Sequence, residues 1–412
     1  MNAQTLQKWN KVKLGDVAEI ESGGTPSSTK PEYWDGGDIC WATLPDLKNK
    51  YLFDTQRKIT QLGLKNSSAK LLPINSIIFS SRATLGEISI TKVDTSTNQG
   101  SKNFICNPTK IDYEFLYYLL KSKVEEISNL ASGATYKEIN KTVFSGVEID
   151  IPSIPVQKQI AQILAVYDDL IYNNIRRIKI LEQTAQAIYK EWFVNFRFSG
   201  YEKVKKIDSG TEFGKIPEKW KVVIISEAIS INPRIKISKT ETVPFIAMDR
   251  LSETSMVINS SNIERRIGGS GSKFLNSDTL FARITPCLEN GKTGYVQFLK
   301  DNEVALGSTE FVVLRSKTLT PEFVYCLSRD KAFRDAAAKT MTGASGRQRV
   351  QNSFFVNHKI IEPSNDILGI FSDLVTPMFR EIKILSEQVN VLKNGRDLLL
   401  PKLITGELTI SN

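Results

Sequence analysis

The stretch from Pro155 to Phe196 limits the possible folds of this chain more than any other part. Apolar residues recur in it with heptad spacing, and neither glycine nor proline falls between Val156 and Ser199. So regular a repeat predicts one long coiled-coil helix rather than a core helix of an ordinary globular domain. About forty residues at roughly 1.5 Å each would form a rod about 60 Å long. The residues expected in its seam are Leu164, Tyr167, Ile171, Ile178 and Leu181.

A second heptad repeat lies near the C-terminus. The same four residues, Ile-Lys-Ile-Leu, occur in both repeats, at 178–181 and at 382–385. Two such helices, each following a globular block, are expected to pack antiparallel as a spacer. The alternative is that both are surface helices of ordinary domains. The residues expected in the second seam are Phe371, Val375, Ile382, Leu385 and Leu392.

Two residues depart from the heptad pattern. Pro377 is expected to kink the second helix or to mark a restart, because proline lacks the N–H group that a helix interior needs. Asn174 occupies a d position of the first helix. A polar side chain there lowers stability, and a role in fixing the register of the helix pair is open.

The bulk properties favour a multidomain protein without membrane spans. A chain of 412 residues is too long for one typical core. No apolar run approaches the roughly twenty residues that cross a bilayer, and Met1–Asn10 lacks a signal region, so we expect a cytoplasmic location. The four cysteines form no CxxC pair and are expected to be reduced. The net charge of +9 fits a nucleic-acid partner, although many other soluble proteins are equally basic.

An internal repeat organises the remaining sequence. Each half opens with a strand-like run led by tryptophan, Trp9–Ile20 and Trp220–Ile231, and Arg82 in the first half matches Arg283 in the second. The ordered series indicates a duplication, in the order block, helix, block, helix. The further matches are Asn103–Ile105 with Glu310–Val312, Glu114–Phe115 with Glu322–Phe323, Ser132–Thr135 with Thr342–Ser345, and Phe144 with Phe354.

The predicted fold class is α+β, with two similar mixed blocks separated by two long antiparallel coiled-coil helices in a pseudo-two-fold internal repeat. Within the first block, residues 76–80 and 87–90 are predicted strands and residues 112–127 a predicted helix. The expected boundaries are 1–153 for the first block, 154–199 for the first helix, 200–217 for a linker, 218–363 for the second block and 364–412 for the second helix.

The sequence offers no active site. The only histidine, His358, lies in an apolar setting, and no GxSxG motif accompanies it. Gly291-Lys292-Thr293 resembles the end of a P-loop, but Pro286 stands where the first glycine is required. Glu381-Ile382-Lys383 has a spacing found in nucleases, yet it lies inside the second heptad helix. We therefore expect no catalytic residue, no metal site and no cofactor in this chain.

Several short motifs occur in an order that is more specific than any one of them alone. They are Leu14–Ala18, Gly23–Pro26, Asn98–Gly100, Gly133–Ile139, Val147–Pro155 and Gln157–Leu164. In this order they resemble the specificity subunit of type I restriction–modification systems, over nearly the whole chain. The sequence departs from the family pattern at Lys158-Gln159, where Glu-Gln is typical, and the second copy lacks the glutamine pair.

The resemblance implies a non-catalytic DNA reader. Each block would be a target recognition domain for one half of a split, asymmetric site in double-stranded DNA. The helices would set the gap between half-sites and dock two methylation subunits, which methylate adenine with S-adenosylmethionine. Two restriction subunits would supply ATP-driven translocation and cleavage. A rod between two similar readers does convert its length into a half-site spacing.

Loops that carry cationic and amide side chains are the natural DNA contacts. The run Gly346–Arg349 is the strongest candidate, and a solvated loop is the alternative. For Arg82 and Arg283 a structural salt bridge is the alternative. The first-block candidates are Thr25, Ser27, Lys30, Arg82, Gln99, Lys102, Tyr136 and Lys137; the second-block candidates are Arg265, Arg266, Lys273, Arg283, Arg347, Gln348 and Arg349.

Two other functions compete with DNA recognition. The first is a structural adaptor whose helices bind protein partners and whose blocks bind no DNA; it would show no salt-dependent DNA affinity. The second is a stand-alone nuclease or methyltransferase, against which the missing motifs count. Duplicated blocks with basic loops favour the DNA reader.

Overall fold

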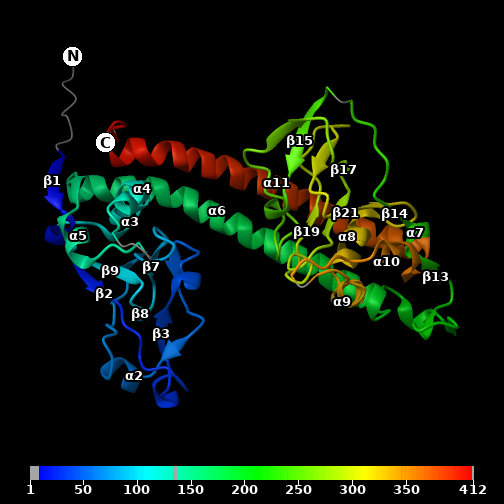
Figure 1. Ribbon diagram of the computed structural model, residues 1–412, viewed down its shortest axis with the longest axis horizontal. Coiled ribbons are helices and arrows are strands. Elements are labelled where there is room, and N and C mark those ends of the chain that lie inside the picture. Colours follow the sequence, from blue (N-terminus) through cyan, green and yellow to red (C-terminus); the bar gives the residue numbers. More distant parts are fainter. Residues whose placement is uncertain (1–8, 133–136, 239, 345, 411–412) are drawn as a thin grey trace. The chain divides into compact units, whose positions relative to one another are not determined.

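The computed structural model describes residues 9–132, 137–238, 240–344 and 346–410 (Figure 1). The chain divides into two compact units: the first comprises residues up to Ile171 together with those from Leu392 onward, and the second comprises Tyr172–Val391. The long helices α6 (Ile154–Tyr189) and α11 (Asn365–Ile404) each contribute a segment to both units. The polypeptide therefore passes from one unit to the other within helices rather than through loops.

The first unit packs helices against a mixed sheet of strand order β2-β9-β6-β7-β4. Within it, α3 and α4 lie beside α6, and α2 lies at the end remote from α6 (Figure 1). In chain order the elements are β1 (Asn10–Lys13), α1 (Leu14–Val17), β2 (Ala18–Ser22), η1 (Pro31–Tyr33), β3 (Ile39–Ala42), η2 (Leu44–Asp46), β4 (Tyr51–Leu52), β5 (Lys58–Ile59), α2 (Gln61–Lys65), β6 (Ile77–Ser80), β7 (Ile88–Thr91), β8 (Thr95–Thr97), β9 (Ser101–Cys106), α3 (Tyr113–Ser122), α4 (Val124–Asn129), α5 (Lys141–Gly146) and β10 (Glu148–Ile151).

The second unit contains a sheet of strand order β14-β21-β18-β19. After α6 its elements are η3 (Lys190–Val194, a π-helical turn), η4 (Tyr201–Lys203), β11 (Lys206–Asp208), β12 (Lys215–Pro217), β13 (Lys221–Ile224), α7 (Ile225–Ala228), β14 (Ile229–Ile231), β15 (Thr242–Ile246), η5 (Met248–Arg250), β16 (Glu264–Ile267), β17 (Ser272–Phe274), β18 (Thr279–Ala282), β19 (Thr293–Tyr295), β20 (Ala305–Gly307), β21 (Phe311–Ser316), α8 (Pro321–Arg329), α9 (Lys331–Lys339), α10 (Asn352–Asn357) and β22 (Lys359–Glu362).

The two units repeat one topology. The order β2-β9-β6-β7 in the first unit corresponds to β14-β21-β18-β19 in the second. A second sheet recurs as well: β3 pairs with β8 in parallel and with β5 antiparallel, just as β15 pairs with β20 in parallel and with β16 antiparallel. The strand pairing therefore confirms the duplication predicted from the sequence.

Hydrogen-bond register corrects two details of the repeat. The predicted match of Asn103–Ile105 with Glu310–Val312 was wrong by three residues, because Ile78 pairs with Asn103 and its equivalent Leu280 pairs with Val313. The Ser81 N–H donates to the carbonyl of Gly100 over 2.8 Å, and the Arg283 N–H donates to the carbonyl of Glu310 over 3.1 Å. Arg283 thus corresponds to Ser81, and the match of Arg283 with Arg82 was wrong by one residue. Identical residue types suggested that match, whereas the strand ladder fixes which backbone positions are equivalent.

Three predicted elements are divided in the structure. The run from Trp220 to Ile231 contains the helical turn α7, because β13 pairs with β22 while β14 joins a different sheet beside β21. The run from Trp9 to Ile20 contains the helical turn α1 between β1 and β2, because β1 pairs with β10 while β2 joins a different sheet beside β9. The predicted helix over residues 112–127 is also two helices, with Lys123 between α3 and α4 in a non-helical conformation. All three corrections arise where the chain turns to reach a new packing partner.

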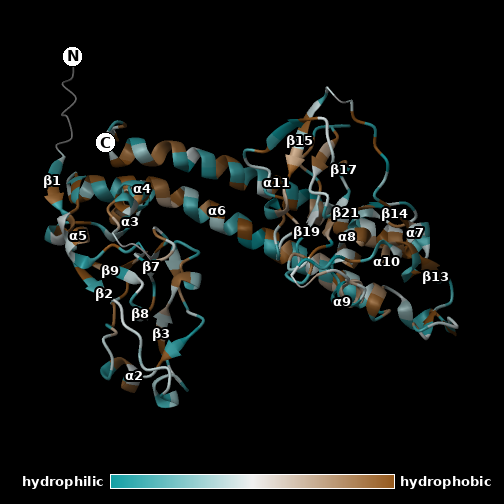
Figure 2. Ribbon diagram, viewed as in Figure 1, coloured by the Kyte–Doolittle hydropathy of each residue, from teal (hydrophilic) through white to brown (hydrophobic). Residues whose placement is uncertain are grey.

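The long helices pack antiparallel within each unit. In the second unit Arg177 of α6 pairs with Glu381 of α11, and Asn174, earlier in α6, bonds to Gln388, later in α11. Hydrophobic and hydrophilic stretches alternate along both helices (Figure 2). Of the predicted seam residues, Leu164, Ile171, Ile178, Phe371, Val375, Ile382 and Leu385 are buried, while Tyr167, Leu181 and Leu392 are half-buried.

Pro377 does not interrupt α11. The helix runs without a break from Asn365 to Ile404, so the predicted restart at Pro377 was wrong. Its exposed ring lies between Val375 and Phe379, whose side chains are both buried in the core of the second unit. Tertiary packing on either side holds the helical backbone despite the missing N–H.

Candidate nucleic-acid interface

Three segments of the first unit meet at the end of β6. Arg82 forms an antiparallel β-bridge with Glu138, and Glu138 forms another with Ser132. The Ile139 N–H donates to the Ser81 carbonyl over 3.1 Å, and the Ser81 N–H bonds to Gly100. These bonds attach the segment that includes Lys137 to the sheet. They also place it beside the 98–100 loop.

Lys102 lies inside this junction rather than on its surface. Its side chain is only 5% exposed, and its ammonium group lies 3.3 Å from Oε1 of Glu138. It also donates to Oγ of Ser81 over 3.3 Å. A buried lysine requires such partners, because an uncompensated buried charge is strongly destabilising. Its ammonium group is therefore engaged by protein atoms, whereas the side chain of Lys137 is exposed.

A second pair of loops meets close to this junction. The hydroxyl of Thr25 donates to Oε1 of Gln99, which joins the glycine-containing loop after β2 to the loop before β9. Both side chains are exposed, as is Ser27, whose carbonyl accepts a hydrogen bond from the indole of Trp34 over 3.0 Å. The ammonium group of exposed Lys30 donates to the Tyr33 hydroxyl over 3.1 Å. Polar and cationic side chains thus gather on a fixed loop surface.

The corresponding junction of the second unit is built around Glu310. Nη2 of Arg349 lies 2.7 Å from Oε1 of Glu310, and Nε of Arg349 lies 2.9 Å from the same oxygen. Arg283 approaches Oε2 of Glu310 at 3.3 Å and also donates to Oδ1 of Asn352 over 3.2 Å. The hydrogen bonds from Arg349 lower the pKa of the Glu310 carboxyl group. The salt bridge considered for Arg283 in the sequence is therefore present.

The loop that follows α9 presents two of the sequence candidates. The Gln348 N–H donates to Oγ1 of Thr285 over 3.0 Å, and the Thr285 N–H donates to the Gln348 carbonyl over 3.0 Å. This mutual pairing holds the loop backbone. Gln348 is half-buried and Arg347 is exposed. Among the described residues, the guanidinium group of Arg347 has no hydrogen-bond or ion-pair partner, so it is available to an external anion.

The remaining second-unit candidates lie around the sheet of strand order β16-β15-β20-β17. Arg265 pairs with Glu303 at 3.1 Å, and Arg266 pairs with Glu264 at 2.7 Å. Lys273 is half-buried and donates to the carbonyl of Ile235 over 3.0 Å. Arg265 and Arg266 retain exposed side chains on the edge strand β16, where a phosphate could compete with the acidic partners.

Sequence reasoning missed an arginine in the first unit. The guanidinium carbon of Arg57 lies 3.7 Å from the ring centroid of Trp34 and 5.3 Å from that of Trp41. The guanidinium carbon of Arg266 lies 3.3 Å from the ring of Phe245, which occupies the strand position equivalent to Trp41. The three first-unit residues are too far apart in sequence for any local pattern to reveal the stack. The arginines are exposed, whereas Trp41 is buried and Trp34 and Phe245 are half-buried. An exposed cation held over such a ring suits phosphate contact.

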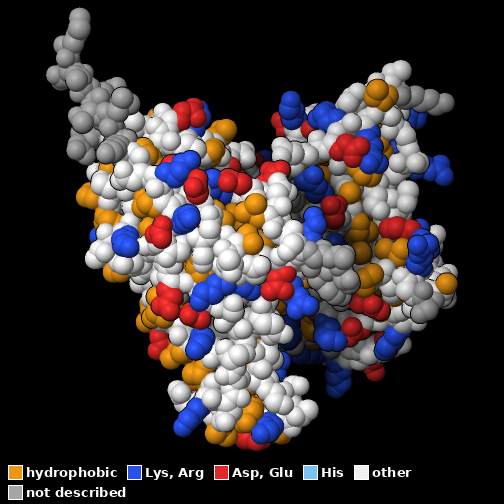
Figure 3. All heavy atoms as spheres, turned by 60° about the vertical axis from the view of Figure 1, so that its left-hand side comes forward, with side chains coloured by type: hydrophobic (Ala, Val, Ile, Leu, Met, Phe, Trp, Pro, Cys, Tyr) orange, Lys and Arg blue, Asp and Glu red, His pale blue; other side chains and the backbone are white. Residues whose placement is uncertain are grey.

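Not every candidate can be placed. Tyr136 lies outside the residues that the structure describes. Arg82 is exposed and belongs to the junction with Glu138. On the face drawn in Figure 3, lysine and arginine side chains are interspersed with acidic ones rather than gathered in one broad patch. DNA contact thus depends on which cations the protein's own carboxylates leave available.

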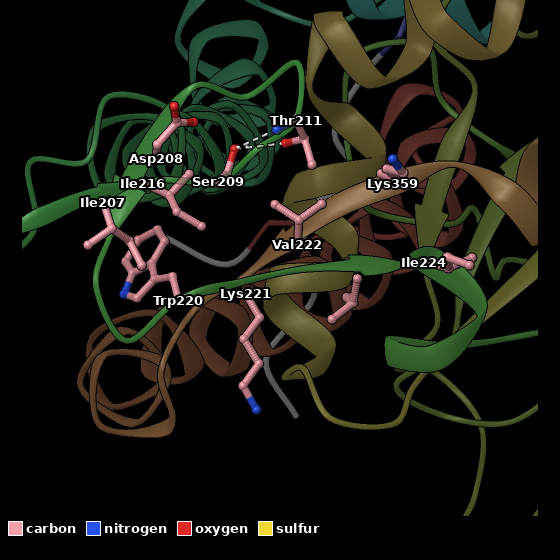
Figure 4. Close-up of a pocket in the computed structure, with 11 residues that line it drawn as sticks. Ile207, Asp208, Ser209, Thr211, Ile216, Trp220, Lys221, Val222, Ile224 and Lys359 are labelled. Atoms are coloured by element: carbon pink, nitrogen blue, oxygen red, sulfur yellow. Dashed lines mark hydrogen bonds between the residues drawn. The ribbon is translucent and has the colours of Figure 1, made fainter.

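One surface hollow of the second unit lies between the hairpin β11–β12 and the strands β13 and β22 (Figure 4). The carboxylate of Asp208 and the ammonium groups of Lys221 and Lys359 point in different directions there. The Ser209 hydroxyl is engaged with Oγ1 of Thr211 at 2.8 Å. The hollow therefore brings no acid, base and nucleophile together.

His358 is a packing residue in the structure. Its ring lies 4.5 Å from the ring of Phe354 and 5.5 Å from that of Phe333, and burial lowers the pKa of the imidazole. In the part of the chain that the structure describes, no group of three or more His, Cys, Asp or Glu side chains could hold a metal ion. None of the described helices is long and apolar enough to cross a membrane.

Comparison with known proteins decides the family. Residues 7–183 match the family described as the type I restriction modification DNA specificity domain. The chain is 31% identical to the type I restriction enzyme MjaIX specificity subunit of Methanocaldococcus jannaschii, over 98% of this chain and 94% of that protein. The chain belongs to the type I restriction enzyme specificity subunits. Its role is DNA recognition, and in this family that role is not catalytic.

Two further similarities extend over the same length. The MjaVIII specificity subunit of M. jannaschii is 21% identical over 98% of this chain and 94% of its own length. The crystal structure of the type I restriction–modification system S subunit from M. genitalium has the same fold, with a TM-score of 0.58, 15% identity and 98% of each chain covered. This shared fold confirms the predicted class of two mixed α/β domains with long helices.

Proposed function

We propose that each unit carries a target recognition domain for one half of a split, asymmetric site in double-stranded DNA. The observation that supports this most is the duplication itself: the same strand order and the same loop junction occur twice in one chain. The two junctions carry different side chains: Lys137 precedes Glu138 in one, and Gln348 precedes the equivalent Arg349 in the other. Different side chains at equivalent positions would read different bases.

The contacts that we propose are the predicted residues with exposed or half-buried side chains on these loops and on β16. Lys102 and Lys273 are left out because their ammonium groups bond to the protein from buried or half-buried positions. Arg283 and Arg349 are left out because they share the Glu310 carboxylate at the loop junction. The proposed contacts are Thr25, Ser27, Lys30, Arg82, Gln99 and Lys137 in the first unit, and Arg265, Arg266, Arg347 and Gln348 in the second.

The two long helices would serve as the spacer between the half-sites. We place the recognition domains at 1–153 and 218–363, the helices at 154–199 and 364–412, and the linker at 200–217. The antiparallel ion pair and amide pair between α6 and α11 support a stiff helix pair rather than a flexible tether. A stiff spacer would convert helix length into a fixed number of unspecified base pairs.

The same helices would bind two methylation subunits, and the complex would recruit two restriction subunits. Several apolar side chains on them are exposed: Val166 and Leu170 in the first unit, and Ile370 and Leu374 in the second, are between 44% and 57% exposed. Exposed apolar residues on a helix already packed along its seam suit a further protein partner. We place this assembly in the cytoplasm, where its DNA substrate is found.

Salt-dependent DNA binding separates this function from the structural adaptor. Affinity of the full-length chain for a random-sequence duplex is measured between about 50 and 200 mM salt. A DNA reader loses affinity steeply, with about 0.9 counterions released per phosphate contact. Combined alanine substitution of Lys137, Arg265 and Arg347 should lower the slope, whereas substitution of Lys158, exposed on α6, should not. Undetectable or salt-independent binding would favour the adaptor.

A further inference from the structure

The two loop junctions share a backbone plan. In the first unit Glu138 forms β-bridges with Ser132 and Arg82; in the second, Arg349 forms them with Thr342 and Ile284. Glu138 and Arg349 therefore occupy equivalent positions, each closing a loop onto the sheet. One position thus carries a carboxylate in one unit and a guanidinium group in the other.

The partners of these two residues are reversed in charge as well. Glu138 pairs with Lys102, which is on β9, and Arg349 pairs with Glu310, which directly precedes β21. The strand β21 is the counterpart of β9, and Gly100 is the residue that corresponds to Glu310. The second unit thus lacks the lysine and uses an acid placed two residues earlier. Each unit thus has an ion pair between the equivalent loop and the equivalent end of a strand, formed by oppositely charged residues at different positions.

We propose that these ion pairs are latches that position the DNA-reading loops, and that Lys102, Glu138, Glu310 and Arg349 are positioning residues rather than DNA contacts. This inference rests on the proposed function. It assigns direct contact to the neighbouring Lys137 and Arg347, whose side chains project from the latched loops into solvent.

Charge and burial distinguish the latch from direct contact. Lys102 is 5% exposed, and Glu310 is 20% exposed and already bonds to both Arg349 and Arg283. If Arg349 left Glu310 to bind a phosphate, a carboxylate would remain close to the DNA backbone, where like charges repel. The latch keeps that carboxylate neutralised. Direct contact from Arg347 breaks no ion pair among the described residues of the loop.

The test is a charge exchange in the full-length chain assembled with its methylation subunit. Glu310→Lys and Arg349→Glu are made singly and together, and affinity is measured for the duplex methylated by the wild type and for one with the second half-site scrambled. Each single variant should lose about tenfold or more of the discrimination between these duplexes. The double variant should discriminate better than either single variant but not as well as wild type, because the exchange restores the pair with position 349 and leaves Arg283 facing a lysine at position 310. Discrimination of the first half-site should stay unchanged throughout.

A matched control uses the neighbouring arginine. Arg347→Glu should lose discrimination, and combining it with Glu310→Lys should not restore it. If the Glu310→Lys/Arg349→Glu double variant stays as weak as Arg349→Glu alone, Arg349 contacts DNA and the latch is wrong. Failure of the wild type to discriminate any duplex would instead contradict the proposed function.

Hydrogen exchange tests the latch without DNA. The amide of Arg349 donates to the Thr342 carbonyl over 2.9 Å, and the amide of Thr342 donates back over 3.1 Å. These amides should exchange faster in each single variant, and more slowly in the double variant than in either single variant. Equal exchange in all four proteins would overturn the latch. The same exchange of charges between Lys102 and Glu138 should show the same pattern in the first unit.

Discussion

The side-chain amide of Asn174 on α6 donates a hydrogen bond to Oε1 of Gln388 on α11 over 3.0 Å. Asn174 is 7% exposed in a seam otherwise made of apolar side chains, while Gln388 is exposed. A buried amide in such a seam lowers stability and favours the one register in which it finds its partner. Gln388 is therefore the hydrogen-bond partner that a role of Asn174 in fixing the register requires.

Replacing Asn174 with leucine should stabilise the helix pair. The leucine adds apolar burial, and the exposed amide of Gln388 remains hydrated. We expect the free energy of unfolding to rise by about 1 kcal/mol, measured by thermal unfolding of helical circular dichroism. Asn173→Leu, on the exposed face, is the control and should change little. A lower midpoint for Asn174→Leu would show that the amide pair contributes net stability.

Breaking the ion pair between Asp168 and Arg396 should be strongly destabilising. The two groups lie 2.6 Å apart and are only 9% and 13% exposed, and Asp168 also accepts a hydrogen bond from the Tyr118 hydroxyl over 2.7 Å. Removing one member of such a pair costs about 3–5 kcal/mol, because the other charge is left buried. Arg396→Ala should therefore lower the free energy of unfolding of the first unit by about this amount, measured by denaturant unfolding.

An exposed ion pair between the same helices provides the comparison. Arg177 and Glu381 are 57% and 37% exposed at 2.6 Å. Surface pairs contribute about 0–1 kcal/mol, so Arg177→Ala should change stability little. Equal losses for Arg177→Ala and Arg396→Ala would contradict the importance of burial.

The stability of the second unit should fall in mild acid through its only histidine. Burial lowers the pKa of His358 below 6.5, so the unfolded chain binds a proton at higher pH than the folded chain does. The free energy of unfolding should therefore decrease as pH falls below about 6.5 toward the folded pKa. His358→Gln should lose less between pH 7 and 5, measured by thermal midpoints. Parallel pH profiles for the two proteins would show that His358 does not contribute.

Arg347 should contribute to recognition without contributing to folding. It is exposed on the loop closed by Arg349. Arg347→Ala should weaken binding to the specific duplex by about 1–3 kcal/mol if it contacts a base edge, and leave the unfolding midpoint unchanged. The matching Lys339→Ala, on an exposed helical position of α9, should alter neither quantity. Wild-type affinity for Arg347→Ala would exclude the contact.

Shortening the helix pair should shorten the gap between half-sites. Residues 171–177 face residues 385–391 in the antiparallel pairing, since Asn174 bonds to Gln388. Deleting both heptads keeps the seam in phase and removes about 10 Å, or about 3 base pairs. Deleting residues 171–177 alone should abolish assembly or alter the gap, because the seams no longer match. An unchanged gap in the methylated motif of the double deletion would refute the spacer.

Periodic features of this chain could be predicted from the sequence, and pairwise contacts could not. The heptads of α6 and α11 place Leu164, Ile178 and Phe371 in buried seams, because helix geometry alone determines which residues share a face. The repeat was visible in the same way. The junctions were not: Lys102 and Glu138 meet only through the pairing of separate strands and loops. No spacing in the sequence marks such a pair.

Tertiary packing also overrode predictions made from local sequence rules. Proline predicts a break, yet Pro377 lies inside a continuous helix between buried Val375 and Phe379. Matching residue types made Arg82 the predicted equivalent of Arg283 in the repeat. The strand hydrogen bonds show that Ser81 is the equivalent residue. Among the candidate contacts, exposed Lys137 and buried Lys102 are both plausible in sequence, and only the folded chain separates them.

The most direct test of the proposed function is adenine methylation mapped across the genome by single-molecule sequencing. Cells carrying this chain with its methylation subunit are compared with cells lacking only this chain. We predict a split motif with two different half-sites and a fixed unspecified gap, methylated only when the chain is present. Exchange of residues 218–363 for the equivalent block of a relative should change one half-site and leave the other intact. A set of methylated sites that does not depend on this chain would contradict its role as the DNA reader.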